Sequence, residues 1–191
     1  DLNGKPRSLI NIYINGKIST LPESAKPQFN FFVDTKGQVI NQEILANFYN
    51  AKEGMKYPSG EFALTRNGEY FLTLTDKEAA AIARNPIVKS VKKYLSPKGK
   101  DEGAFPHISS LGWNVDNFGP IYIPKKGVTI QLNIKTLPFY ERIIQEYEKN
   151  SLEVKNQQII INGKVSTSYT FKQNYYWMMG DNRQSSLDAR F

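Results

Sequence analysis

The sequence predicts an α+β fold in which β-rich flanks surround one smaller module of mixed helices and strands. The first indication is a series of short runs that alternate apolar and polar residues, a pattern typical of half-buried strands. The second is the dipeptide Asn-Gly, which recurs between such runs and favours two-residue hairpin turns. The third is that residues 27–95 read in the order β-α-β-β-α-β, which is the ferredoxin-like order. With 40% hydrophobic residues among 191, the chain can bury a sizeable core.

The composition excludes several classes of protein. The chain has no cysteine, which excludes disulfides, thiolate catalysis and cysteine-based zinc sites. It contains no run approaching the ~20 apolar residues that span a bilayer, and no signal peptide is visible. The formal charge is +7, but the basic residues are dispersed, and the densest run, from Lys89 to Lys100, fits a solvated surface or contact with lipid headgroups. We expect no nucleic-acid partner, because core packing explains the aromatic residues in predicted strands better than base stacking does.

The first β-rich flank comprises residues 1–26. Leu9–Ile14 and Lys17–Thr20 read as strands, and the Asn-Gly pair between them favours a hairpin, because both turn positions need a positive φ. The nine residues Ile12–Thr20 recur with nearly the same sequence as Ile159–Thr167. Two explanations are open, a repeated hairpin unit or convergence on one turn chemistry. The match beyond the turn favours a repeat, and we expect both hairpins in one β-region.

The module, residues 27–95, has four predicted strands and two predicted helices. Asn41 can cap the first helix, and Thr75 with Glu78 has the spacing of a capping box that opens the second. Asn85-Pro86 ends the second helix, because the residue before a proline disfavours helical backbone. We expect one four-stranded sheet with both helices on one face. The predicted elements are strands Gln28–Asp34, Glu61–Arg66, Glu69–Leu74 and Ile87–Leu95, and helices Gln42–Tyr49 and Thr75–Ala83.

The rest of the chain divides into a loop and a second β-rich part. Residues 96–118 are rich in Gly, Ser, Pro, Asp and Asn and read as a loop or linker. Residues 119–191 read as mainly β, with one helix over Leu137–Lys149 that Thr136 can cap and that accommodates Pro138 in its first turn. The strands predicted here are Pro120–Ile123, Val128–Ile134, Leu152–Val154, Gln158–Ile161 and Tyr169–Met179.

Few residues outside the C-terminal segment are candidates for chemistry. His107 is the single histidine and falls in a predicted loop, so a solvated side chain is favoured over a metal ligand or a catalytic base. Glu141, Glu146 and Glu148 share one predicted helix with Arg142, and their spacing favours a solvated face with local ion pairs. The sequence has no glycine-rich phosphate loop.

The C-terminal segment from Tyr175 to Arg190 carries the most specific pattern. An aromatic strand runs into a Gly-Asp-Asn turn, and several polar and charged residues follow. Asp188 and Arg190 are two apart, so extended backbone would place them on one face, where a carboxylate and a guanidinium can pair. From residue types alone, a salt-bridged turn is the favoured interpretation.

The order of residues in this segment is more specific than its composition. The run Met-Gly-Asp-Asn-Arg, followed by Ser186, Asp188 and Arg190, resembles the last conserved box of bacterial type I signal peptidases. Ala189 stands where that family usually has serine. The close resemblance covers residues 152–191, and the middle of the chain resembles the variable insertion that enlarges some members.

The resemblance implies a membrane-anchored serine endopeptidase that removes signal peptides from secreted pre-proteins at the extracytoplasmic (periplasmic) side of the cytoplasmic membrane. In such enzymes a serine attacks the peptide carbonyl, a neutral lysine takes its proton, and no metal or cofactor is required. The box of the nucleophile is absent, since no serine here is followed two residues later by methionine, and the string Leu-Pro-Gly-Asp that follows the base lysine is absent as well. We therefore expect a remnant of the β-rich signal-peptidase-like catalytic fold with an inserted module, inactive by itself, whose parent is anchored by a transmembrane segment not in this chain.

By the same resemblance, the chain retains residues that support the dyad. Ser186 would hydrogen-bond the base lysine and orient it, and Asp188 and Arg190 would pair and brace the loop. The loop beside the dyad would be shaped by Asp181, Asn182 and Arg183. The expected partners are signal peptides and the membrane surface, with no nucleic acid and no metal. The alternative is a non-catalytic extracytoplasmic binding module in which the insertion contacts translocating chains, lipid or a partner protein.

Overall fold

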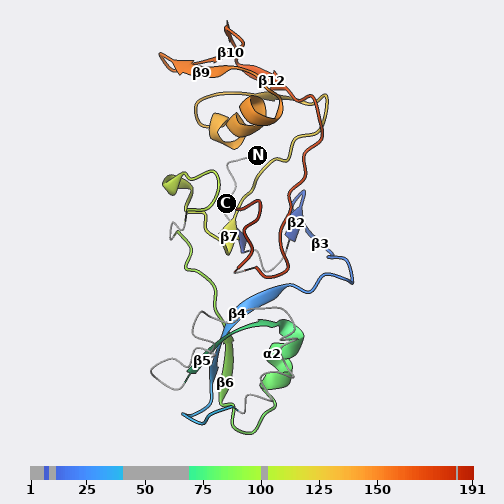
Figure 1. The fold of residues 1–191 in the computed structure, drawn as a ribbon, viewed down its shortest axis with the longest axis vertical. Helices are drawn as coiled ribbons and strands as arrows, with labels where there is room; N and C mark the ends of the chain where they lie inside the picture. Colours follow the sequence, from blue (N-terminus) through green and yellow to red (C-terminus); the bar gives the residue numbers. More distant parts are fainter. Residues whose placement is uncertain (1–6, 9–11, 41–68, 100–102, 184) are drawn as a thin grey trace. The chain divides into compact units, whose positions relative to one another are not determined.

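The computed structural model describes residues 7–8, 12–40, 69–99, 103–183 and 185–191 (Figure 1). The chain divides into two compact units. Unit 1 comprises Asp1–Arg7, Gly99–Met178 and Ala189–Phe191, and unit 2 comprises Ser8–Lys98 and Met179–Asp188. The described parts hold many short strands and few helices, which confirms an α+β class rich in strands.

Unit 2 is built on a three-stranded antiparallel sheet in the order β5-β4-β6 (Figure 1). β4 (Gln28–Asp34) and β5 (Glu69–Thr75) bury every second residue, as strands covered on one face do. β6 (Ser90–Lys93) pairs with the other edge of β4. The helix α2 (Asp76–Ile82) contributes its buried residues to the same core as the inner face of this sheet.

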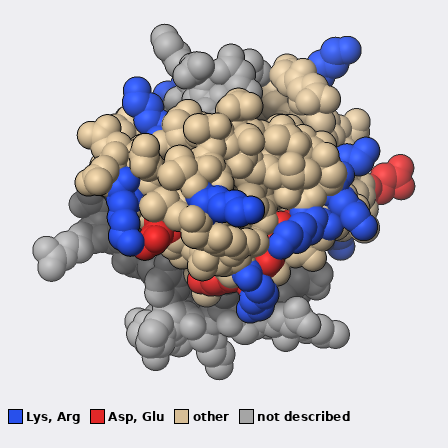
Figure 2. All heavy atoms as spheres, turned by 90° about the horizontal axis from the view of Figure 1, so that it is seen from above, with Lys and Arg blue, Asp and Glu red and all other residues tan. Residues whose placement is uncertain are grey.

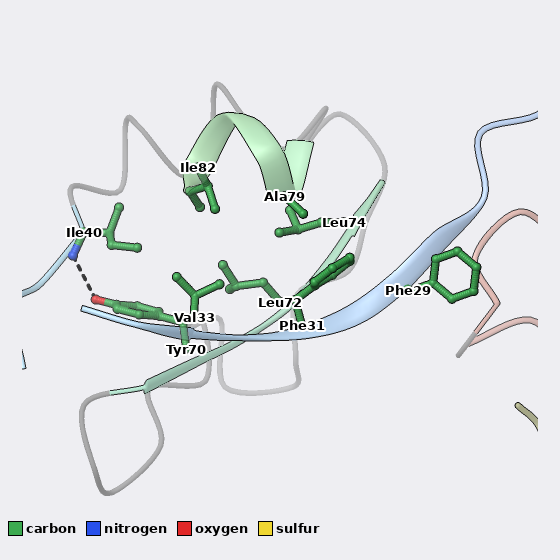
Figure 3. Packing of buried hydrophobic residues seen from close by; sticks show 9 residues of the cluster. All are labelled: Phe29, Phe31, Val33, Ile40, Tyr70, Leu72, Leu74, Ala79 and Ile82. Carbon is green, nitrogen blue, oxygen red and sulfur yellow. Dashed lines mark hydrogen bonds between the residues drawn. The ribbon is translucent and has the colours of Figure 1, made fainter. Parts of the chain in front are cut away.

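The core of unit 2 lies between the sheet and α2, where side chains from both point toward one another (Figure 3). Val33, Leu74 and Ile82 are fully buried, with 0% exposure. Full burial of such a side chain stabilises the fold by about 1.5–3 kcal/mol. The cluster comprises Phe29, Phe31, Val33, Ile40, Tyr70, Leu72, Leu74, Ala79 and Ile82.

The helix α2 begins at a capping box, where β5 ends. Thr75 Oγ1 accepts the Glu78 N–H at 3.2 Å, and Glu78 Oε2 accepts the Thr75 N–H at 2.7 Å. These bonds satisfy N–H groups that the first turn of a helix leaves without partners. The predicted capping box is confirmed, and the helix ends before Asn85-Pro86 as expected.

The predicted four-stranded module lies only partly within the described residues. Gln28–Asp34 and the strand inside Ile87–Leu95 lie in one sheet, as predicted. The predicted helix Gln42–Tyr49 and the predicted strand Glu61–Arg66 lie outside the described residues. The complete ferredoxin-like arrangement therefore stays a prediction.

Both Asn-Gly pairs of the repeated sequence form hairpin turns with positive φ at each turn residue, as in a type I′ turn. One hairpin joins β2 (Ile12–Ile14) to β3 (Lys17–Ser19), and the other joins β10 (Gln158–Ile161) to β11 (Lys164–Val165). The two hairpins belong to different sheets and to different units. The expectation of one shared β-region is therefore wrong, and shared turn chemistry explains the similar sequences.

Unit 1 contains several small sheets. β9 (Leu152–Lys155), β10 and β11 form an antiparallel sheet of three strands. β8 (Thr129–Gln131) pairs with β12 (Ser168–Thr170). β1 (Arg7–Ser8), whose first residue belongs to this unit, forms a two-stranded sheet with β7 (Asn117–Phe118).

Several predictions for unit 1 differ from the structure. Pro120–Ile123 forms no strand, and its proline supplies no N–H to a ladder. The predicted strand Tyr169–Met179 is confined to β12, because only its first residues pair with β8. Residues 96–118, predicted to be a loop or linker, hold the short 3-10 helix η1 (Ser109–Leu111), the strand β7 and the buried Trp113.

An aromatic cluster explains why Trp113 and Phe118 of this segment are buried. The ring centroid of Trp113 lies 4.4 Å from that of Phe118 and 5.6 Å from that of Phe139. The ring of Trp177 lies 5.1 Å from that of Phe118. Aromatic pairs at such distances contribute about 0.5–1.5 kcal/mol beyond the area they bury. The large rings of this Gly- and Pro-rich segment therefore belong to the core of unit 1.

The single helix predicted over Leu137–Lys149 is interrupted. It begins as a 3-10 helix, η2 (Leu137–Phe139), with Pro138 in the first turn as expected, and continues into a π-helix, η3 (Ile143–Tyr147). Thr136 makes no capping hydrogen bond with its side chain, so its predicted role as a cap is wrong. The Thr136 hydroxyl instead donates to the carbonyl of Asn133 at 3.2 Å, which competes with capping.

Candidate functional site

Residues 179–188, hereafter the motif loop, belong to unit 2 and contact the first residue of β4. The Gln28 N–H donates to the carbonyl of Asp181 at 2.7 Å, and the Gln28 carbonyl accepts the Arg183 N–H at 3.0 Å. Asn182 between them forms a parallel β-bridge with Gln28. The Asp181 carboxylate also accepts the N–H of Lys26 at 2.9 Å. The motif loop is thus held to β4 as a very short added strand.

Gly180, Ser186 and Asp188 lie together within the motif loop. Asp188 Oδ2 accepts the Gly180 N–H at 3.0 Å. A Cβ on residue 180 would lie 2.2 Å from Ser186 Oγ and 2.6 Å from Ser186 Cβ, closer than side-chain atoms approach. Gly180 has no positive φ, so it is space rather than backbone conformation that requires glycine here.

The side chain of Ser186 is half-buried on a fixed backbone. Its N–H donates to the carbonyl of Asn182 at 3.0 Å. Within the part of the chain that the structure describes, its hydroxyl makes no hydrogen bond. The hydroxyl can therefore donate to or accept from a group beyond those residues.

Arg183 connects the middle of the motif loop to its beginning. Its side chain is 5% exposed, and Nη1 donates to the carbonyl of Gly180 at 2.8 Å. A hydrogen bond with a charged donor is stronger than one between neutral groups, and burial reduces competition from water. Arg183 therefore limits how far Gly180 can move away from Ser186.

Arg190 belongs to unit 1 and is fully buried, with 0% exposure. Its Nη1 donates to the carbonyl of Val115 at 2.9 Å, and its own carbonyl accepts the Phe105 N–H at 2.7 Å. Both partners lie in the segment predicted to be a linker, which Arg190 thereby anchors. The ion pair between Asp188 and Arg190 stays a prediction.

The other candidates from the sequence are mostly solvated, as expected. His107 is exposed in a loop and has a φ of 63°. Arg142 Nε and Glu146 Oε2 form an exposed ion pair at 2.9 Å, one helical turn apart, and Glu141 is exposed too. The expectation that Glu148 shares this solvated face is wrong, because Glu148 is only 7% exposed.

Glu148 is the centre of a polar cluster inside unit 1. Its Oε2 accepts from the Tyr169 hydroxyl at 2.5 Å, and its Oε1 accepts from the Lys172 N–H at 2.8 Å and the Tyr175 hydroxyl at 3.0 Å. Burial and the bond to Glu148 raise the pKa of Tyr169 well above its usual range, and burial also raises the pKa of Tyr175. Both phenols are therefore neutral donors near neutral pH. Their hydrogen bonds satisfy the buried carboxylate, so the cluster stabilises the fold.

The π-helix η3 is what turns Glu148 inward. The Glu148 N–H donates to the carbonyl of Ile143, five residues back, at 2.9 Å, where an α-helix would use a carbonyl four back. The side-chain partners of Glu148 lie 21, 24 and 27 residues further along the chain. No local signal in the sequence could have revealed this burial.

The charged side chains on the face drawn in Figure 2 add little to these two clusters. Figure 2 shows one face of the molecule, where Lys and Arg side chains are spread among uncharged residues and form no single patch. Among the described residues, no group of three or more His, Asp or Glu side chains is placed to hold a metal ion. No helix in that part of the chain is long and apolar enough to cross a membrane.

A scan against protein-family models and searches of curated proteins and of solved structures find no match to this chain. The geometry and residue types of the motif loop therefore carry the case for a function.

Proposed function

We propose that this chain is part of a membrane-anchored serine endopeptidase of the type I signal peptidase kind, and that residues 179–190 support its Ser/Lys dyad. The observation that best supports this function is that the residues of the motif hold one another. Gly180 leaves room for Ser186, Asp188 accepts the N–H of Gly180, and Arg183 donates to the carbonyl of Gly180. A polar turn of arbitrary sequence has no need for this set of residue types at these positions.

The environment of Ser186 suits a residue that orients a base. The backbone of Ser186 is fixed by Asn182, and the hydroxyl makes no hydrogen bond within the described part of the chain. A lysine amine contributed by another segment of the parent could be held by this hydroxyl in the direction needed to take the proton of the nucleophilic serine. Orientation of this kind matters because small displacements of a catalytic group cost large factors in rate.

The reaction would be acyl transfer. The nucleophilic serine attacks the peptide carbonyl that follows the signal sequence, and the neutral lysine accepts the serine proton and later passes it to the leaving amine. A lysine is neutral near pH 7 only if burial or a neighbouring cation lowers its pKa. Signal peptides reach the extracytoplasmic side of the membrane, which would therefore be the location of this chain.

The finer fold belongs to the same proposal, a β-rich catalytic fold with an inserted ferredoxin-like module. In a βαββαβ sheet the first strand lies between the third and the fourth and is antiparallel to both. β4 lies between β5 and β6 and is antiparallel to both. This order supports a module inserted between the flanks.

The test uses the parent protein, which carries this chain and the dyad segments, in membrane vesicles with a secreted pre-protein as substrate. Ser186→Ala is expected to slow cleavage about 10- to 100-fold, as removal of a group that orients a metal ligand typically does in metalloenzymes. Ser185→Ala is the matched control, because Ser185 is the exposed neighbour in the same loop. The 191-residue chain alone is expected to cleave nothing. Equal rates for the two variants, or turnover by the chain alone, would contradict this function.

A non-catalytic binding module is the second candidate, and the sheet face of unit 2 opposite α2 favours it. Phe32, Phe71 and Tyr94 form a triad there, with ring centroids 4.8, 5.6 and 5.7 Å apart, and all three are partly exposed. Clustered aromatic side chains are typical of binding surfaces. Cross-linking of a translocating chain to this face should be lost in Phe71→Ala, and unchanged cross-linking would count against a binding role.

A further inference from the structure

We propose that Asp181 is a positioning residue that fastens the motif loop to β4, so that the sheet and helix of unit 2 determine where the Ser186 hydroxyl lies. This inference rests on the function proposed above and assigns the inserted module a part in it. The module would be a platform for the dyad-supporting loop and not merely an independent appendage.

Among the described residues, three hydrogen bonds within unit 2 attach the motif loop to β4 and to Lys26, which precedes it. The Asp181 carboxylate accepts the Lys26 N–H at 2.9 Å, and the Asp181 carbonyl accepts the Gln28 N–H at 2.7 Å. The Gln28 carbonyl accepts the Arg183 N–H at 3.0 Å. Asp181 is thus an acceptor in two of the three bonds, and its carboxylate makes the only one of them that uses a side chain.

The site of attachment adjoins the buried core of unit 2. Gln28 is the first residue of β4, and the next residue, Phe29, is 3% exposed in the core of unit 2. In the β4–β5 ladder, Gln28 is directly opposite Thr75, which is the N-cap of α2. Gln28, which holds the motif loop, therefore also pairs with the residue that caps α2. A shift of the sheet or of α2 would be transmitted to the loop through Gln28.

The attached part of the loop is in turn connected to Ser186. The Ser186 N–H donates to the carbonyl of Asn182 at 3.0 Å, and Arg183 Nη1 donates to the carbonyl of Gly180, against which Ser186 packs. Release of residues 181–183 from β4 would therefore loosen both contacts that locate Ser186. Of the three hydrogen bonds described above, the one to the Asp181 carboxylate uses a side chain and can be removed by substitution, so Asp181 is the residue to test.

The first measurement is backbone hydrogen exchange in this chain, and it does not depend on activity. Asp181→Ala is expected to speed exchange of the Lys26 amide about tenfold, as for loss of one hydrogen bond to a charged group, and to speed exchange of Gln28 and Arg183 as well. Asp181→Asn should retain most of the protection, because its amide oxygen can still accept. Glu23→Ala is the control, since it removes an exposed carboxylate from the same unit.

Unchanged exchange at the three amides in Asp181→Ala, or equal loss in Asp181→Asn, would overturn the attachment. Exchange within the middle of β4 should be the same in all variants, because the core of unit 2 is untouched. A uniform increase there would instead show that Asp181 acts only on the stability of the unit, and would also overturn a positioning role.

The second measurement is cleavage by the parent protein. Asp181→Ala should lower kcat about tenfold with little change in KM, and Asp181→Asn should restore most of the loss. If Ser186→Ala lowers kcat but Asp181→Ala does not, the positioning role is refuted while the proposed function stands. If Ser186→Ala has no effect on kcat, the proposed function is refuted and the positioning role with it.

Discussion

Replacement of Gly180 by alanine tests the geometry of the motif loop most directly. The added Cβ would lie 2.2 Å from Ser186 Oγ and 2.6 Å from Ser186 Cβ. The hydroxyl can rotate away, but the Cβ of Ser186 is attached to the backbone and can move only if the loop moves. Overpacking of this kind costs about 1–3 kcal/mol. The hydrogen bond from the Gly180 N–H to Asp188 would be strained by the same shift.

This cost in free energy corresponds to a measurable change in how well the loop amides are protected from hydrogen exchange. A loss of about 1–3 kcal/mol corresponds to roughly 5- to 150-fold faster exchange of the Ser186 amide, which is bonded to the carbonyl of Asn182. A double-mutant cycle with Ser186→Gly tests the contact, because this substitution removes both atoms that the new Cβ would meet. In the double variant Gly180→Ala/Ser186→Gly, we expect most of the lost protection against hydrogen exchange to be recovered. The coupling energy between the two substitutions should be at least about 1 kcal/mol.

The refuting result is additivity. If the free energy of protection lost in the double variant equals the sum of the losses in the two single variants within about 0.5 kcal/mol, the two residues do not act through their contact. If the Ser186 amide exchanged as slowly in Gly180→Ala as in the original chain, the close approach of Gly180 and Ser186 would be refuted. In the parent protein, the same double variant should fold but cleave slowly, since the hydroxyl is missing.

Three further predictions concern stability. Thr75→Ala should destabilise unit 2 by about 1 kcal/mol through loss of the α2 cap, and unchanged protection of α2 amides would contradict this. Leu74→Ala, at 0% exposure, should cost about 2–5 kcal/mol in urea unfolding, whereas Leu187→Ala, at 90% exposure, should cost almost nothing. Burial raises the pKa of Tyr140 from 10.0 to about 12. The stabilisation that the neutral Tyr140 side chain gives the folded state is therefore fully present below pH 10 and is lost as the pH rises to 12. Between pH 8 and 11 the free energy of unfolding should therefore fall by about 1 kcal/mol less in Tyr140→Phe than in the original chain.

Elements determined by neighbouring residues were predicted well from the sequence. The strand Gln28–Asp34 is found with its predicted bounds, because strict alternation leaves one register that buries the apolar face. The capping box at Thr75 and both Asn-Gly hairpins are likewise local, since a few adjacent residues determine each. The sheet to which each hairpin belongs is decided by distant contacts, and that prediction is wrong.

Elements determined by distant partners were missed. The helix predicted over Leu137–Lys149 has good local signals, yet it contains a π-turn. The buried Glu148 is held at this turn by Tyr169 and Tyr175, which its sequence neighbours do not reveal. Residues 96–118 have the composition of a loop, but Trp113 and Phe118 within this range are buried in an aromatic cluster.

In the candidate site too, the features determined by neighbouring residues could be predicted and those determined by distant partners could not. The order of residues 179–190 makes this segment the most specific pattern in the sequence, and the proximity of Gly180 and Ser186 reflects short-range packing within it. The attachment of Asp181 to Lys26 spans 155 residues of sequence, and no pattern in either segment predicts it. Only the folded chain brings these two residues together.

The positions of the two tryptophans have a practical consequence. Trp113 and Trp177 both belong to unit 1 and contact the same ring, that of Phe118. Intrinsic tryptophan fluorescence therefore follows the unfolding of unit 1 alone, while far-ultraviolet circular dichroism follows both units. Coincident denaturation curves from the two signals would mean that the units unfold as one cooperative system, and separated curves would give each unit its own stability. The two tryptophans thus report on the unfolding of unit 1 without an added label.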